Sequence, residues 1–268
     1  MRQHHSLARL LASAAVTAIL AASLGGCQTM SDITGSLTSK AEASPNADPR
    51  NAVEVYGERY RANPKDAEAA LAYGQALRAT GQRAQAVAVL EQATIAHAGN
   101  KALLAAFGRA LADNGNFQQA FDVLSRAHSP ENPDWRILSV QGTALDQLGR
   151  HDEARRYYAS ALKIVPEEPT VLSNLGLSYM LSRELPKSEE VLRRAYASTR
   201  ADARVRQNLG LVVGLQGRFA EAESIVKADL PPEEAAANVA YLKQMLSRKD
   251  NQRAGVGTMP VASINRPD

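Results

Sequence analysis

The sequence contains a single cysteine, Cys27, among its 268 residues. An internal disulfide is therefore impossible. Aromatic residues make up only 5% of the chain while alanine is abundant, and this balance favours closely packed helices over a β-rich fold. No run of five or more Lys or Arg residues occurs, which argues against a basic patch for nucleic acid.

Long apolar segments are also absent. The longest uncharged apolar run, residues 10–24, is shorter than the roughly 20 residues that a membrane span requires. It follows a basic start with Arg2 and Arg9 and is followed by Gly25 and Gly26. A basic start, a short apolar core and small residues at the end predict a secretory signal peptide over residues 1–26.

The lone cysteine directly follows this segment. Leu24-Gly25-Gly26-Cys27 resembles the bacterial lipobox, and the resemblance implies that Cys27 carries lipid chains as a membrane anchor. Because Gln28 follows it, where Asp would resemble an inner-membrane retention signal, we expect the outer membrane, facing the periplasm. The alternative is a chance cysteine beside an ordinary cleavage site. Without Arg2 and Arg9, the net charge of +3 falls to about +1.

The middle of the chain repeats with a period of 34 residues, which indicates an array of helical units. One row of glycines is Gly74, Gly108, Gly142, Gly176 and Gly210, and a second row is Gly81, Gly115, Gly149, Arg183 and Gly217. A third row is Ala86, Ala120, Ala154, Ser188 and Ala222, and a fourth is Leu90, Leu124, Tyr158, Leu192 and Val226.

Each row has a physical interpretation. Gly74 lies within a helix, where glycine costs about 1 kcal/mol relative to alanine, so we expect a neighbouring helix to press close there. Gly81 ends that helix as a left-handed cap. Ala86 again permits close approach, and Leu90 fills the space between the two helices. Each unit is therefore two antiparallel helices and a tight turn. Arg183 departs from the pattern, and its turn is expected to be longer or strained.

These residues resemble the tetratricopeptide repeat, which has small residues, a turn glycine and an apolar residue at these positions. The resemblance implies an all-α fold, a right-handed superhelical solenoid of about five helix pairs with capping helices. The predicted repeats are residues 67–100, 101–134, 135–168, 169–202 and 203–236.

The flanks of this array have their own predicted roles. Residues 50–66 align with a second helix alone and form a half-repeat, and residues 233–247 form a capping helix that completes an array over 49–248. Residues 27–48 form a flexible tether, and residues 249–268 form a disordered tail.

The sequence carries no motif for catalysis. His97, His128 and His151 lie singly in or beside predicted turns, and no His/Cys/Asp/Glu set has metal-ligand spacing. The glycines follow the repeat rather than a phosphate-binding loop, and no nucleophile motif such as G-x-S-x-G occurs. We therefore expect no enzyme activity, no cofactor, no metal and no small-molecule substrate, and we expect protein partners instead.

The first helix of each tetratricopeptide repeat lines a concave face, so the resemblance implies a partner-binding groove. The predicted groove residues are Arg78, Arg109, Arg136, Asn174, Leu177, Arg204, Asn208 and Leu211. The groove is polar and charged toward its N-terminal end and more apolar toward its C-terminal end. Asn174 and Asn208 share a position where related repeats hydrogen-bond an extended peptide; the alternative is an ordinary solvated groove. Ser173 and Leu177 replace the basic residue and Asn of a carboxylate clamp.

The last third of the chain carries a more specific resemblance. Residues 208–246, with "LQGRFAEAE", "DLPPEEAAANVAYL" and the closing "ML", resemble the C-terminal end of the TadD family, tetratricopeptide lipoproteins of tight-adherence (Flp-type) pilus assembly. The resemblance implies an outer-membrane pilotin or scaffold that helps a pilus secretin assemble or localise. The alternative is a general envelope adaptor for outer-membrane protein assembly, division or peptidoglycan enzymes.

Overall fold

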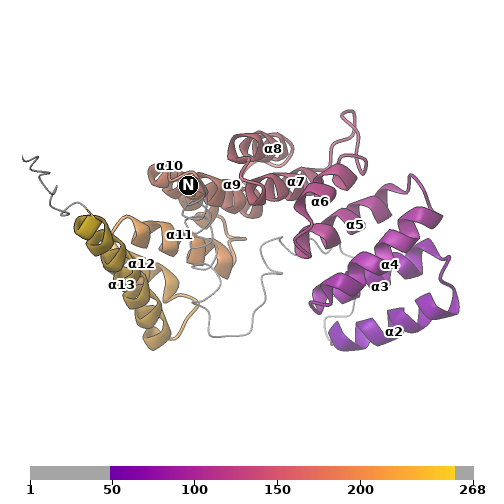
Figure 1. Cartoon of the computed structure of the whole chain (residues 1–268), viewed down its shortest axis with the longest axis horizontal. Helices are drawn as coiled ribbons and strands as arrows, with labels where there is room; N and C mark the ends of the chain where they lie inside the picture. Colours follow the sequence, from indigo (N-terminus) through magenta and orange to yellow (C-terminus); the bar gives the residue numbers. More distant parts are fainter. Residues whose placement is uncertain (1–48, 257–268) are drawn as a thin grey trace, which may run out of the picture. The chain divides into compact units, whose positions relative to one another are not determined.

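The structure, a computed structural model, describes residues 49–256, and every regular element in this range is an α-helix (Figure 1). The all-α prediction is therefore confirmed. The described residues fall into two compact units, residues 49–201 and residues 202–256, where the sequence predicted one array over 49–248. The predicted signal peptide, Cys27 and the tether lie outside the described residues.

The first unit opens with a single helix, α2 (Pro49–Ala62), and continues with four helix pairs. The pairs are α3 (Ala67–Ala79) with α4 (Arg83–Ala96), α5 (Lys101–Asp113) with α6 (Phe117–Leu124), α7 (Trp135–Gln147) with α8 (His151–Ile164), and α9 (Pro169–Leu181) with α10 (Leu185–Tyr196). Each helix packs on the next along the chain. In addition, α3 contacts α5, α5 contacts α7, and α7 contacts α9, so the first helices of the pairs form one continuous layer.

The second unit contains α11 (Ala203–Leu215), α12 (Phe219–Val226) and α13 (Pro232–Val256). The last helix packs on both others, and a Cβ added to Gly214 would lie 2.6 Å from Leu242 Cδ2, so α11 and α13 are in close contact there. The helix continues beyond the predicted end at residue 247 and through residues 249–256, which were predicted as tail. That stretch contains no proline, so no residue blocks the propagation of the helix from its packed part.

A polar residue stands directly before the first helix of each pair, and these five residues are again 34 apart. They are Asp66, Asn100, Asp134, Glu168 and Asp202. Four of these side chains accept hydrogen bonds from amides of the first turn and so satisfy donors that the helix itself leaves unpaired. Glu168 makes no such bond and instead pairs with Arg200 at 2.8 Å.

The turn inside each pair has the same length in all five pairs, including the fourth. Four turns use a glycine in the left-handed region, Gly81, Gly115, Gly149 and Gly217. Arg183 adopts the same conformation with φ 63°, and the Glu184 amide donates to Tyr179 O at 2.9 Å, as the equivalent amides do in the other turns. The fourth turn is therefore strained rather than longer, because a side chain occupies a conformation that favours glycine.

The mid-helix glycines create room for one side chain of the following helix. A Cβ added to any of them would lie 2.5–2.6 Å from that side chain. The pairs are Gly74 with Leu90, Gly108 with Leu124, Gly142 with Tyr158, Gly176 with Leu192, and Gly210 with Val226. The expected close approach of two helices at these glycines is thus present in every pair.

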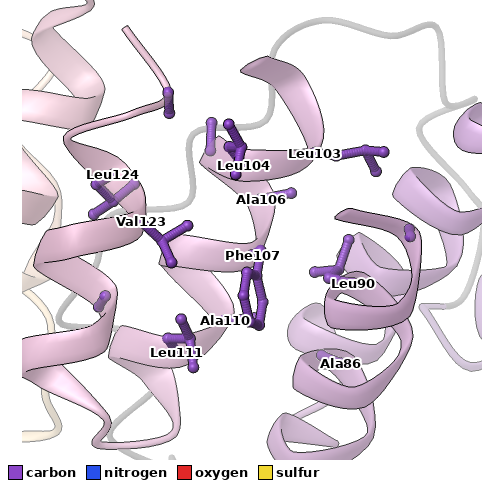
Figure 2. Packing of buried hydrophobic residues seen from close by; sticks show 14 of the residues in the cluster. Ala86, Leu90, Leu103, Leu104, Ala106, Phe107, Ala110, Leu111, Val123 and Leu124 are labelled. Carbon is purple, nitrogen blue, oxygen red and sulfur yellow. The ribbon is translucent and has the colours of Figure 1, made fainter. Parts of the chain in front are cut away.

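Apolar side chains between successive helices form the core of the first unit. Figure 2 shows Phe107 and Leu111 of α5, with Leu90 of α4 on one side and Val123 and Leu124 of α6 on the other. All five side chains are buried. A helix of this layer is therefore held from both sides, which leaves its remaining face for other contacts.

Candidate binding surface

Three of the predicted groove residues lie on successive first helices of the first unit. Arg78 is in the last turn of α3, Arg109 is in the middle of α5, and Arg136 is in the first turn of α7. Arg78 Nε donates to Asp113 Oδ2 at 2.6 Å, and the Asp113 side chain is only 4% exposed. This ion pair connects α3 to α5. We call Arg78, Arg109 and Arg136 the arginine cluster.

Arg109 occupies the centre of the arginine cluster. Burial lowers the pKa of Arg109, and the positive charges of Arg78 and Arg136 lower it further, while Asp134 and Asp113 oppose this effect. Its Nε atom is buried and has no hydrogen-bond partner among residues 49–256. The guanidinium of Arg109 is therefore held in a partly desolvated place with an unsatisfied donor.

Arg136 lies at the edge of the cluster and, like Arg109, has a buried nitrogen without a hydrogen-bond partner among residues 49–256. Its guanidinium carbon lies 4.6 Å from the centre of the Trp135 ring, a cation–π contact, while its Nε atom is buried without a partner in the described part of the chain. Asp134 accepts a hydrogen bond from the Arg136 amide at 2.8 Å, so this carboxylate serves mainly as the cap of α7.

Asn174 and Leu177 lie on α9 of the same unit. Asn174 is 8% exposed, and its Nδ2 donates to Ser139 Oγ of α7 at 3.1 Å. One amide hydrogen of Asn174 is thus used inside the fold, while the binding of a peptide by this side chain stays a prediction. Leu177 is half-buried.

The other three candidates lie on α11 of the second unit. Arg204 is half-buried and donates to Asp202 Oδ2 at 2.7 Å, beside the start of the helix. Asn208 and Leu211 are half-buried on the same helix. The structure thus brings the arginine cluster together in one unit and groups Arg204, Asn208 and Leu211 in the other.

A buried polar network joins α7, α8 and α9. Ser178 Oγ donates to Asp146 Oδ1 at 2.8 Å, the Tyr158 hydroxyl donates to Asp146 Oδ2 at 2.9 Å, and His151 Nδ1 lies 2.8 Å from Asp146 Oδ1. Burial raises the pKa of Asp146, although these hydrogen bonds oppose the shift. We call these four residues the Asp146 network.

The Asp146 network was not predicted as a unit, and it corrects one expectation. The Asp146 side chain is 7% exposed and contacts other residues of the fold. His151 was expected to lie alone, but it contacts Asp146 across the turn at Gly149. The sequence signal that could have revealed this contact is the spacing of five residues between Asp146 and His151 on either side of the turn glycine Gly149. Ser178 is fully buried, so the network braces helices and exposes no nucleophile.

The described residues give little support for a metal site or for a helix that spans a membrane. Within residues 49–256, no group of three or more His, Cys, Asp or Glu side chains is placed to hold a metal ion. None of the helices in this range is both long and apolar enough to cross a bilayer. Cys27, the predicted lipidation site, lies outside the range. The arrangement of the described helices is suited to binding through a layer of adjacent helices.

Comparison with known families agrees with the repeat period. The family described as "Tetratricopeptide repeat" matches residues 105–169 and again residues 139–203. The family described as "Anaphase-promoting complex, cyclosome, subunit 3" matches residues 48–127. Comparison with curated proteins finds no match.

Solved structures with the same fold include three from different settings. PilW, described as a widely conserved type IV pilus biogenesis factor, is 17% identical with a TM-score of 0.62, over 72% of this chain and 91% of that chain. A tetratricopeptide repeat protein from Parabacteroides merdae is 12% identical with a TM-score of 0.63, over 72% and 78%. The APC/C complex Cut9–Hcn1 is 16% identical with a TM-score of 0.59, over 74% and 40%. At these identities the likeness shows the fold alone.

Proposed function

The chain carries tetratricopeptide repeats, and we propose that it is a lipid-anchored scaffold that assists assembly of a tight-adherence (Flp-type) pilus. The observation that carries this proposal is the stretch over residues 208–246, which resembles the TadD family. This stretch contains α11 from Asn208 onward, all of α12 and most of α13, and these helices pack together as one unit. PilW, a pilus biogenesis factor with the same fold, is compatible with such a role.

The proposed location is the periplasmic face of the outer membrane. It rests on the lipobox-like Leu24-Gly25-Gly26-Cys27 and on Gln28 after the cysteine. Two or three acyl chains, at about 0.8 kcal/mol per buried CH2, hold a protein stably at a bilayer, whereas one chain is marginal. The helix layer would then bind a protein partner, with the pilus secretin as the proposed one, and it would act without catalysis.

Deletion of the gene tests the role in the pilus. We expect loss of surface pili by electron microscopy and loss of heat-resistant secretin multimers on immunoblots, with both restored by the wild-type gene. Intact multimers and pili in the deletion strain would rule out the proposal.

The anchor is tested separately by Cys27→Ser. We expect this variant to remain unlipidated and to leave the outer-membrane fraction, while Ser23→Ala, a change outside the lipobox, fractionates as the wild type does. Outer-membrane fractionation of Cys27→Ser would contradict the anchor.

A second candidate function is a general envelope adaptor for outer-membrane protein assembly, division or peptidoglycan enzymes. It is favoured by the fold itself, because stacked helix pairs present binding surfaces for many kinds of partner. Neighbouring genes separate the two candidates: a secretin gene and a pilus ATPase gene beside this one support the pilus role. Envelope defects without pilus defects in the deletion strain would support the adaptor.

A further inference from the structure

We propose that the arginine cluster on α3, α5 and α7 is a docking site for an extended, acidic segment of a protein partner, with Arg109 at its centre. This inference rests on the proposed scaffold function and names the chemistry of the segment that the scaffold binds.

The placement of the three arginines suits an extended segment. They lie on three helices that contact one another in sequence, α3 with α5 and α5 with α7. Neighbouring helix axes are roughly 8–10 Å apart, so the three side chains extend over roughly 20 Å. An extended chain rises about 3.3 Å per residue, and about six residues therefore reach across all three.

The protein itself compensates these charges only in part. Asp113 pairs with Arg78, and the Asp134 carboxylate accepts from the first-turn amide of α7. Arg109 and Arg136 each keep a buried Nε donor without a hydrogen-bond partner in the described residues. Residues 49–256 offer no acceptor for either Nε atom, and the half-buried side chains of Arg109 and Arg136 keep positive charge that an acidic partner would offset.

A carboxylate is the acceptor that fits best. A guanidinium presents donors in a planar fork that matches the two oxygens of a carboxylate, and a charged partner also offsets the mutual repulsion of the arginines. Burial lowers the pKa of Arg109, and the positive charges of Arg78 and Arg136 lower it in the same direction. The next first helix, α9 (Pro169–Leu181), carries no charged residue, so the basic surface is confined to the first three pairs.

The acceptors are expected to be Asp or Glu side chains rather than a C-terminal carboxylate. Ser173 and Leu177 stand where a carboxylate clamp has a basic residue and an Asn. The arginine cluster is instead spread over three helices, which favours several carboxylates along one segment over a single terminal group.

Fluorescence anisotropy with the full-length protein in detergent tests the docking site. The probe is a labelled peptide of about twelve residues that alternates Glu and Gly, acetylated and amidated at its ends, and the matched control peptide carries Gln for Glu. We expect the Glu peptide to bind about tenfold more tightly or better, since hydrogen bonds to charged groups are the stronger ones. Added salt should weaken this binding.

Two charge-matched variants locate the site. Arg109→Gln should weaken binding of the Glu peptide about tenfold, whereas Arg156→Gln, at an exposed arginine of α8, should change it less than about twofold. The thermal midpoint of Arg109→Gln should stay equal or rise, because the substitution removes a partly desolvated charge with an unsatisfied donor. Lost binding would then not reflect lost folding.

Three results would overturn the inference. The first is equal binding of the Glu and Gln peptides, and the second is binding of the Glu peptide by Arg109→Gln as tight as that of the wild type. The third is displacement of the Glu peptide by inorganic phosphate at equal concentration, because this would indicate a general anion site. Self-association that is lost in Arg109→Gln would assign the surface to a second copy of the chain instead. Normal pili in an Arg109→Gln strain reject only the docking site, whereas normal pili in the deletion strain reject only the pilus role.

Discussion

Gly142 of α7 lies directly against the ring of Tyr158 of α8, and a Cβ on Gly142 would come within 2.6 Å of Tyr158 Cε1. The ring has little freedom to yield, because its hydroxyl donates to Asp146 Oδ2 at 2.9 Å and lies 3.3 Å from Thr143 Oγ1. The missing side chain at Gly142 thus decides how closely the two helices approach. It also sets the place at which the Asp146 network forms.

Gly142→Ala should destabilise the first unit. Overpacking of a well-packed site costs about 1–3 kcal/mol, of which the better helix propensity of alanine recovers up to about 1 kcal/mol. We expect a net loss of about 1–2 kcal/mol in the free energy of unfolding, measured by urea denaturation. Ala159→Gly, at an exposed position of α8, is the propensity control and should cost no more than about 1 kcal/mol. An unchanged midpoint for Gly142→Ala would show that Tyr158 moves freely.

Arg183→Gly should stabilise the fourth pair. Arg183 is exposed and has φ 63°, a conformation that costs a non-glycine residue about 1–2 kcal/mol. Glycine removes this strain but gains freedom in the unfolded chain, so we expect a net gain of about 0.5–1 kcal/mol. The reverse change, Gly149→Arg in the third turn, should lower the free energy of unfolding by a comparable amount, and the midpoint of thermal unfolding should fall accordingly. A lower midpoint of thermal unfolding for Arg183→Gly would show that the left-handed backbone conformation of Arg183 is not strained.

Much of the fold could be predicted from the period, because its main contacts lie within one repeat. Gly142 and Tyr158 belong to two of the four rows, and their contact needs only one helix, one turn and the next helix. The same holds for the turn at Arg183. The Asp146 network was missed because Ser178 enters it from the next repeat, and the directions of side chains on stacked helices are not readable from spacing.

The candidate site was predicted less completely, for a similar reason. Three arginines on first helices were expected to line a groove, but the unsatisfied Nε atoms of Arg109 and Arg136 depend on burial in three dimensions. The hydrogen bond from Asn174 to Ser139 was likewise not predicted, because it joins residues of two successive repeats. The division after Ala201 has no mark in the first glycine row, which continues unbroken through Gly210.

Asn174→Ala should cost stability. Ser139 is 4% exposed and loses the donor that reaches its hydroxyl, so we expect a loss of about 1 kcal/mol in the free energy of unfolding. The double variant Asn174→Ala with Ser139→Ala removes both partners and should recover part of this loss, which a double-mutant cycle measures. If the two changes add without coupling, the hydrogen bond between α7 and α9 contributes nothing to stability.

The stability of the first unit should depend on pH through Asp146. Because burial raises the pKa of Asp146 above its unfolded value, the folded state retains the proton more strongly than the unfolded chain does. The contribution of this carboxyl is therefore fully present below the unfolded pKa and is lost as the pH rises through the folded pKa. The Asp146→Asn variant has no titrating group at this position, so its stability relative to the wild type should improve as the pH rises above about 4.

This comparison must separate Asp146 from the groups that face it. His151 and Tyr158 are the titratable neighbours, and burial raises the pKa of Tyr158 well above its usual value, which keeps the hydroxyl neutral across this window. Repeating the urea titrations in a His151→Gln background removes the imidazole, and the pH trend between wild-type Asp146 and Asn should keep its sign. A trend that reverses would mean that the ionised carboxylate is the form that the fold stabilises, with Ser178 and Tyr158 as its hydrogen-bond donors outweighing burial.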